Sequence, residues 1–125
     1  MATFEVSAHM KVRPGQLEGF KKQAAELIRI TREQDTHTLR YDWFLSTDGT
    51  ECEVREAYTG PEGLMEHNAH IVEARTKLFK DYADGHFMTL YGEPSQALID
   101  LLKKHAAGFT WFSFAQGLNA LTTDH

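Results

Sequence analysis

Two stretches of alternating apolar and polar residues flank Asp48-Gly49, and no other feature limits the local structure of the chain as much. Asp-Gly in this setting is a strong hairpin signal and favours a two-residue type I′ turn. We therefore expect strands over residues 39–45 and 52–58. The turn places Asp42 beside Arg55, a favourable charge pair that supports the same register. On the other side of the hairpin the expected pairs are Leu45 with Cys52, Trp43 with Val54, Tyr41 with Glu56, and Leu39 with Tyr58.

The segments around the hairpin alternate between strand and helix patterns. Residues 3–12 alternate as a half-buried strand, and residues 14–33 repeat apolar positions at helical spacing. Pro14 and Pro61 each suit the first turn of a helix, the second helix covering 61–80. A strand over 86–92, a short helix over 96–105 and a strand over 109–114 follow. We expect an α+β fold with a ferredoxin-like βαββαβ core, an antiparallel sheet of four strands, and an added C-terminal helix and strand.

Length and charge restrict the class of protein. A single domain of 125 residues is large enough to bury a hydrophobic core. We expect one domain over 1–125, with its central fold over 3–92, a C-terminal extension over 93–118 and a loose tail over 119–125. The net charge of −5 disfavours nucleic acid and anionic membranes as partners, and no apolar run is long enough to span a membrane. The single cysteine, Cys52, indicates a cytoplasmic location, and we expect it to be a small buried hydrophobe.

Polar side chains on the helix over 61–80 fall where an apolar stripe should be. At about 100° per residue, Asn68 and Arg75 lie near the centre of that stripe. Glu56 belongs to the inward-facing set of its strand, opposite Tyr41 and two residues before Tyr58. An amide, a guanidinium and a carboxylate are therefore expected to point into the same layer between helix and sheet.

Two interpretations of this cluster are open. In the structural one, Glu56 and Arg75 form a buried ion pair with Asn68 beside it, because leaving one partner alone costs about 3–5 kcal/mol. In the functional one, the three residues line a polar cavity with aromatic walls, which is the usual form of a small-molecule site.

The histidines do not predict a metal site. His70 lies about 140° from the apolar stripe and is expected to face solvent. His67 lies near the stripe's boundary, either at the mouth of the cavity or simply on the edge of the helix. The glutamate that follows the first histidine of zinc-protease motifs is missing. His9 is expected on the far face of the sheet, as a polar residue of a subunit interface.

Over about residues 3–92 the chain resembles the antibiotic biosynthesis monooxygenase family of dimeric α/β-barrel proteins. The resemblance is carried by the strand ending in Val12-Arg13-Pro14-Gly15, by the hairpin segment RYDWFLSTDGTECEVREAYTGPEGLMEHNAHI and by the order of the elements. Glu56, Tyr58, Leu64 and His67 are similar to the family's layout of an acidic strand residue, an aromatic residue and a histidine on the second helix. The tail from YGEPSQALIDLL to FSFAQGL is similar to an extension seen in some members.

The resemblance implies a homodimer, in which the bare sheet faces pack together into a barrel and each subunit keeps a cavity between sheet and helices. Members with known activity oxygenate phenolic, anthrone-like or quinol-like aromatic molecules with O2, without flavin, haem or metal. We therefore expect a cofactor-free monooxygenase acting on a small aromatic molecule. A non-catalytic ligand-binding or stress-associated barrel protein is the alternative. Haem-degrading relatives carry functional residues at positions that here look like Ala8, Tyr58 and a non-histidine near Lys77, which argues against that activity.

The enzyme hypothesis gives each candidate residue a role. Glu56 is the expected base, and burial should raise its pKa while Arg75 opposes the shift. As further catalytic residues, Arg75 would be the charge partner of a phenolate or a peroxide, and Asn68 and Tyr58 would orient ring oxygens. The expected substrate-binding residues are Trp43 and Tyr41, stacked on the ring, and His67 at the mouth of the cavity.

Overall fold

The computed structural model describes residues 3–105 and 108–119 and contains one five-stranded sheet with three helices. The sheet order is β2-β3-β1-β4-β5, and no helix within the described ranges is long and apolar enough to cross a membrane. The elements follow one another as β1 (Phe4–Val12), α1 (Leu17–Gln34), β2 (Thr38–Leu45), β3 (Glu51–Tyr58), α2 (Pro61–Asp81), β4 (Ala83–Tyr91), α3 (Gln96–His105) and β5 (Phe109–Phe112).

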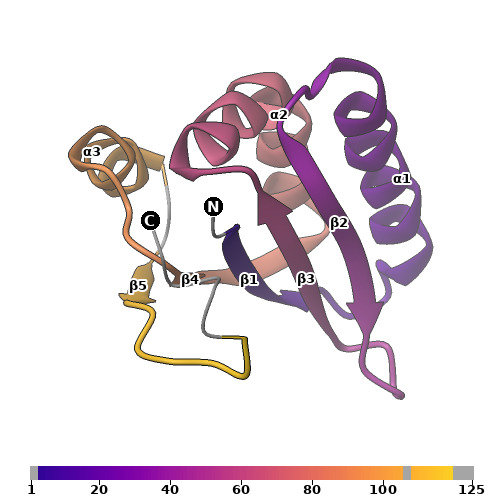
Figure 1. Cartoon of the computed structure of the whole chain (residues 1–125). Helices are drawn as coiled ribbons and strands as arrows, with labels where there is room; N and C mark the ends of the chain where they lie inside the picture. The colour runs from indigo at the N-terminus through magenta and orange to yellow at the C-terminus, as the bar shows by residue number, and fades with distance from the viewer. Residues whose placement is uncertain (1–2, 106–107, 120–125) are drawn as a thin grey trace.

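The first six elements have the expected ferredoxin-like arrangement. Strands β2, β3, β1 and β4 form an antiparallel sheet, and α1 and α2 pack side by side on one of its faces (Figure 1). The added strand β5 pairs with the edge strand β4 in parallel, because α3 carries the chain back before β5 begins. The complete sheet is therefore mixed, whereas its core of four strands is antiparallel as predicted.

The hairpin register is confirmed for three of the four predicted inward pairs. Tyr41 faces Glu56, Trp43 faces Val54, Leu45 faces Cys52, and Asp42 faces Arg55 on the other side. The predicted pair of Leu39 with Tyr58 is wrong, because the register shifts between Thr38 and Arg40 and Thr38 takes the place opposite Tyr58. The extra residue leaves Leu39 58% exposed.

The predicted type I′ turn is wrong, although its register holds. That turn needs a positive φ at two residues, but here only Gly49 has one, at 72°. The strands instead close at Ser46, whose N–H donates to the carbonyl of Glu51 over 2.8 Å, and the N–H of Gly49 donates back to the carbonyl of Ser46 over 2.9 Å. The Asp48 carboxylate accepts from the N–H of Thr50 over 3.1 Å and so stabilises the longer loop.

The structure confirms the predicted helix start for Pro61 but not for Pro14. Pro61 occupies the first turn of α2, as predicted. Pro14 does not begin a helix, because Gly15 follows it with a φ of 78°, a left-handed conformation that a helix cannot contain. Helix α1 therefore starts at Leu17, after a turn in which the N–H of Gln16 donates to the carbonyl of Arg13.

The core lies between the sheet and the helices, and α3 contributes to it. Leu98 is fully buried and Leu102 is 4% exposed, although both belong to the C-terminal extension. Cys52 is 1% exposed, which confirms it as a buried small residue, and burial raises the pKa of its thiol to about 12. The predicted tail over 119–125 lies outside the described residues except for Asn119.

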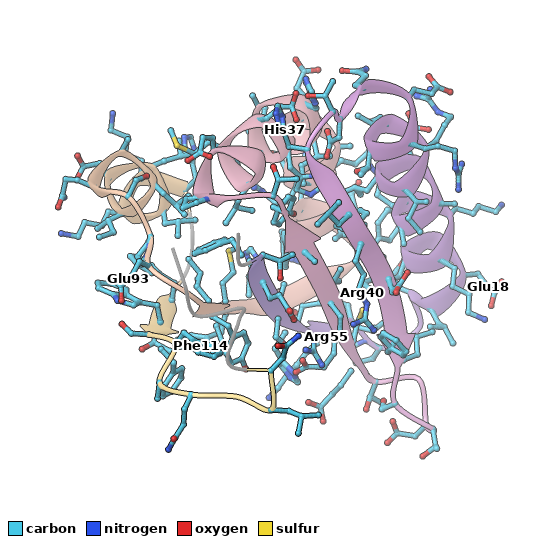
Figure 2. All side chains as sticks on the ribbon, viewed as in Figure 1. Glu18, His37, Arg40, Arg55, Glu93 and Phe114 are labelled. Atoms are coloured by element: carbon cyan, nitrogen blue, oxygen red, sulfur yellow. The ribbon has the colours of Figure 1, made fainter. Side chains whose placement is uncertain are left out.

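On the opposite face of the sheet, no helix of residues 3–105 or 108–119 is packed (Figure 1). Here His9 bridges two carboxylates, 2.8 Å from Glu51 and 2.5 Å from Glu53, so its predicted place on the far face is confirmed. Figure 2 shows Arg55 on this face, pointing away from α1 and α2. Several aromatic side chains there are about half exposed, namely Phe44, Phe87, Tyr91 and Phe112.

We expect Leu98→Ala to destabilise the protein by about 2–5 kcal/mol, because it leaves a cavity beneath α3. Urea denaturation measures the loss. Leu118→Ala is the matched control, since Leu118 is fully exposed and its truncation should change stability by no more than about 0.5 kcal/mol. Equal midpoints for the two variants would show that α3 does not belong to the cooperative core.

Candidate functional site

A cavity of about 40 Å³ lies between α2 and the sheet, and residues from seven elements line it. This volume holds about one water molecule, so the layer is nearly filled. Most of the wall is apolar, and α3 closes one side with three leucines. The lining residues are Ala8, Met10, Leu27, Tyr41, Trp43, Val54, Glu56, Leu64, His67, Asn68, Ile71, Arg75, Leu78, Phe79, His86, Met88, Leu98, Leu101, Leu102 and His105.

Glu56 points into this layer, as its place in the strand predicts. It is 6% exposed and accepts a hydrogen bond from the hydroxyl of Tyr58. Burial raises the pKa of the Glu56 carboxyl above its usual range, although His67, Tyr58 and Arg75 oppose the shift. Tyr58 is fully buried and does not line the cavity, so it stands behind Glu56 rather than beside it.

Arg75 and Asn68 also face the cavity, as predicted, but they pair with each other. The Arg75 guanidinium donates to the side-chain carbonyl of Asn68, which lies about two turns earlier on the same face of α2. Arg75 and Glu56 do not form the ion pair of the structural interpretation; they interact only through space. Burial lowers the pKa of Arg75, whereas Tyr41 and Glu56 counteract this. A neutral amide is thus the direct partner of a largely buried cation.

Trp43 and Tyr41 form an aromatic wall on β2. Their rings meet edge to face at 5.8 Å, and Phe20 of α1 packs against Trp43 at 5.9 Å. Burial, with the nearby Glu56 carboxylate, raises the pKa of Tyr41 well above its usual value. Both predicted residues line the cavity.

His67 is more buried than the sequence predicts. The sequence places His67 near the boundary of the apolar stripe, but its side chain is only 2% exposed. Its ring packs against Tyr41 at 4.6 Å and lies near Tyr58 at 5.7 Å. Gly63, one turn earlier, permits this closeness, since a Cβ there would lie 2.9 Å from the Cβ of Tyr58. The expectation of a helix-edge histidine is wrong for this reason.

Asp35, which follows α1, lies beside the candidate site and was missed by the sequence analysis. Its side chain is 1% exposed, and its two oxygens accept from Nδ1 of His67 over 2.7 Å and from Nδ1 of His70 over 2.6 Å. The expectation that His70 faces bulk solvent is therefore wrong; it is 26% exposed and turned towards Asp35. An aspartate just after a helix gives no sequence signal for partners more than 30 residues away.

The contact with Asp35 determines which His67 nitrogen is free. A carboxylate only accepts, so Nδ1 donates, and in the neutral ring Nε2 then presents its lone pair. Nε2 is buried and has no hydrogen-bond partner among the residues that the structure describes. Burial alone would raise the pKa of Asp35, but the bonds from His67, His70 and Thr38 hold it at about 2.

A wider groove adjoins the cavity at the start of β4. Its volume is about 530 Å³, and it shares Arg75, Phe79, His86 and His105 with the cavity. Burial, helped by Arg75, lowers the pKa of His86 to about 4, and its ring stacks on Phe79 at 4.7 Å. The sequence analysis did not select His86 or His105, because neither stands in a recognisable motif.

The described residues give little support for metal binding or for a nucleophilic thiol. Among the described residues no set of three or more His, Cys, Asp or Glu side chains is arranged to hold a metal ion. The Cys52 thiol is buried with a raised pKa, which does not favour a nucleophilic thiolate. The arrangement is suited to proton transfer and to stabilising negative charge in a small, mainly apolar space.

The comparisons with known proteins agree with the resemblance seen in the sequence. Residues 3–59 match the model of the family described as Antibiotic biosynthesis monooxygenase, so the resemblance is confirmed over β1, α1, β2 and β3. A search of curated protein sequences found no match.

Solved structures share the fold at low sequence identity. MupZ from Pseudomonas fluorescens is 22% identical with a TM-score of 0.75, and the match covers 95% of each chain. Rv0793 from Mycobacterium tuberculosis is 23% identical with a TM-score of 0.64, covering 77% of this chain and 99% of its own. A Nitrosomonas europaea protein, provisionally named an antibiotic biosynthesis monooxygenase, is 20% identical with a TM-score of 0.65, covering 73% and 89%. At these identities the likeness shows the ferredoxin-like fold.

We expect Asp35→Asn to remove part of the acid sensitivity of the fold. A carboxyl whose pKa falls from 3.8 to about 2 on folding stabilises the protein above about pH 4, and this stability is lost as the pH falls towards 2. At 1.36 kcal/mol per pKa unit the contribution is about 2 kcal/mol. Urea denaturation at pH 6, 4, 3 and 2 should show the difference between native protein and variant shrinking by that amount.

Asp42→Asn is the control, because it removes an exposed carboxylate of the outer sheet face. A stability difference between native protein and Asp35→Asn that is the same at every pH would contradict the buried Asp35–histidine contacts.

Proposed function

We propose that the protein is a monooxygenase that uses O2, without a bound cofactor, on a small phenolic or quinol-like aromatic molecule. The main observation in support is the set of three polar side chains, Glu56, Asn68 and Arg75, in a buried and mainly apolar cavity without a direct acid–base ion pair. The family match over 3–59 and a structural neighbour provisionally named a monooxygenase support the same class of activity.

The proposed roles follow from the charges and contacts of the site. Glu56, with its raised pKa, accepts the proton of a substrate hydroxyl, and Tyr58 acts as a positioning residue that holds the carboxylate. Arg75 stabilises the resulting anion, and Asn68 keeps the guanidinium in place. Nε2 of His67, which has no partner among the described residues, forms a hydrogen bond with the substrate.

The reaction needs no external reductant when the substrate is electron-rich. Ionised naphthohydroquinone can give electrons to O2 directly; one oxygen atom forms a new C–O bond and the other leaves as water. The products are 2-hydroxynaphthoquinone and water, so the four electrons that reduce O2 all come from the substrate. The protein contributes deprotonation, orientation and exclusion of water.

An aromatic ring does not fit the cavity at its present 40 Å³. The adjoining groove is much larger, and the two spaces meet at Arg75, Phe79, His86 and His105. We propose that the substrate occupies the groove and reaches into the cavity, where Trp43 and Tyr41 form the inner wall.

A non-catalytic ligand-binding protein is the second candidate, because the same groove and cavity can hold a small aromatic molecule without a reaction. In that case a small aromatic molecule raises the melting temperature without consuming oxygen.

The test mixes the protein with naphthohydroquinone under anaerobic conditions, then adds ¹⁸O2 and analyses the products. We expect 2-hydroxynaphthoquinone with one ¹⁸O atom, formed faster than in buffer, whereas spontaneous oxidation gives unlabelled naphthoquinone. Glu56→Gln should slow turnover at least about 100-fold, because it removes the proton acceptor.

Glu73→Gln is the matched control, since Glu73 is an exposed carboxylate of α2 that does not line the cavity. Full turnover by folded Glu56→Gln would remove Glu56 from the mechanism. An absence of ¹⁸O incorporation together with ligand-induced stabilisation would favour the binding protein instead.

The proposed enzyme is a homodimer joined through the uncovered sheet face. That face presents half-exposed aromatic side chains beside charged ones, and Phe87 lies near its centre, opposite His9. A monomer rarely leaves such an apolar group in water.

Phe87→Glu should weaken the dimer at least about 30-fold, because an unpaired carboxylate would be buried in the interface. Sedimentation velocity over a dilution series measures the effect. Gln34→Glu on α1, away from this face, should leave the assembly unchanged. A native protein that is monomeric at all concentrations would contradict the proposed interface.

A further inference from the structure

Among the residues that the structure describes, no carboxylate touches Arg75 and balances its charge. Its direct partner is the side-chain carbonyl of Asn68, which is neutral. Other arginines of the chain contact acidic groups, such as Arg29, which lies 2.7 Å from Glu26 and 2.8 Å from Glu33. Those arginines lie at the surface, where water screens them, whereas burial penalises the charge of Arg75. A largely buried cation of this kind favours a negative group beside it.

Arg75 lies where an anion from solvent would reach it. It lines both the cavity and the wider groove, so it forms part of their common boundary. The groove is lined by Val72, Arg75, Thr76, Phe79, Ala83, Asp84, Gly85, His86, Lys104 and His105.

The groove has an excess of positive charge. Lys104, in the last turn of α3, adds a second cation to Arg75. Asp84 is the single carboxylate in the described lining, and Arg13 neutralises it through contacts of 3.1 Å. Lys104 alone would be unremarkable at the end of a helix, where cations interact favourably with the helix dipole. Arg75 lies inside α2 and has no such explanation.

The same groove offers an apolar surface for a flat molecule. Phe79 and His86 are stacked with an interplanar angle of 28°, and Val72 lies beside them on α2. His86 is neutral at pH 7, because its pKa is about 4, so it adds a ring without a further charge. A volume of about 530 Å³ accommodates a bicyclic aromatic molecule.

We propose that the groove between α2, α3 and the start of β4 binds the carboxylate of an aromatic acid, with Arg75 and Lys104 as its charge partners and Phe79 and His86 as the surface for its ring. The proposal deepens the proposed function, because it names the substrate class of the same site: an aromatic carboxylate rather than a neutral quinol. It also gives α3 a role, since α3 supplies a cation to the groove and leucines to the cavity.

The test is equilibrium binding without turnover. Anaerobic calorimetric titrations of the full chain at low salt compare 2-naphthoate with 2-naphthamide, which has nearly the same shape and no charge. We expect 2-naphthoate to bind at least about tenfold more tightly, and the preference to fall as salt is added. Equal affinities of the two probes would overturn the proposal, as would tighter binding of the amide.

Arg75→Gln should abolish the preference for the acid, and Lys104→Gln should reduce it about two- to fivefold, because Lys104 is exposed. Lys103→Gln is the matched control: it removes the neighbouring charge in the same helical turn but does not line the groove. If Arg75→Gln does not fold, as judged by circular dichroism, the test compares the preference for the acid in Lys104→Gln with that in Lys103→Gln. Equal effects of those two variants would contradict a site in this groove.

Two further measurements separate this inference from the proposed function. Tighter binding of 2-naphthyl phosphate than of 2-naphthoate would replace the carboxylate assignment with a phosphate one. The ¹⁸O2 assay is then repeated with 1,4-dihydroxy-2-naphthoate, the acid counterpart of naphthohydroquinone. Selective binding of 2-naphthoate without oxygenation of either quinol would support the inference and refute the monooxygenase. Oxygenation of both quinols at equal efficiency would support the monooxygenase and refute the inference.

Discussion

The buried carboxylate of Asp35 holds together three segments that are distant in sequence. Its backbone ends α1, it accepts a hydrogen bond from Thr38 at the start of β2 over 2.6 Å, and it accepts two more from His67 and His70 of α2. Glu66 adds contacts to Thr36 and His37, so the whole α1–β2 connection is fastened to α2; Figure 2 labels His37 at this junction. Since a buried carboxylate without partners costs several kcal/mol, these contacts stabilise the rotation of α2 that its apolar stripe already favours. That rotation turns Asn68 and Arg75 towards the sheet.

The layer between α2 and the sheet contains three separate polar pairs instead of one ion pair. Tyr58 holds Glu56, Asn68 holds Arg75, and Asp35 holds His67. Within the part of the chain that the structure describes, this division leaves an acid with a raised pKa, a cation without an acidic contact and an imidazole nitrogen without a hydrogen-bond partner around one small cavity. A structural ion pair would have neutralised the first two, so their separation supports the ligand site that we propose.

The C-terminal extension is part of this site rather than an appendage. The family match ends at residue 59, yet α2, β4 and α3 supply most of the cavity wall and all of the groove. Leu98 and Leu102 dock α3 onto the core, and its last turn brings Lys104 and His105 to the groove. The fold shared with MupZ covers 95% of the chain, whereas the other two structures compared cover 73% and 77%.

The sequence by itself determined the order of elements, the hairpin register around Tyr41 and Glu56, and the inward direction of Asn68 and Arg75, because these follow from periods of two and 3.6 residues. It did not determine which side chains contact one another across the fold. The bulge near Leu39, the left-handed Gly15 after Pro14 and the burial of His67 depend on contacts across the fold, which periodicity does not encode. Only the tertiary structure brought Asp35 to two histidines more than 30 residues away and joined Arg75 to the groove beside α3. Pairing of buried charges depends on distances of a few ångströms, and those distances exist only once the layers have packed.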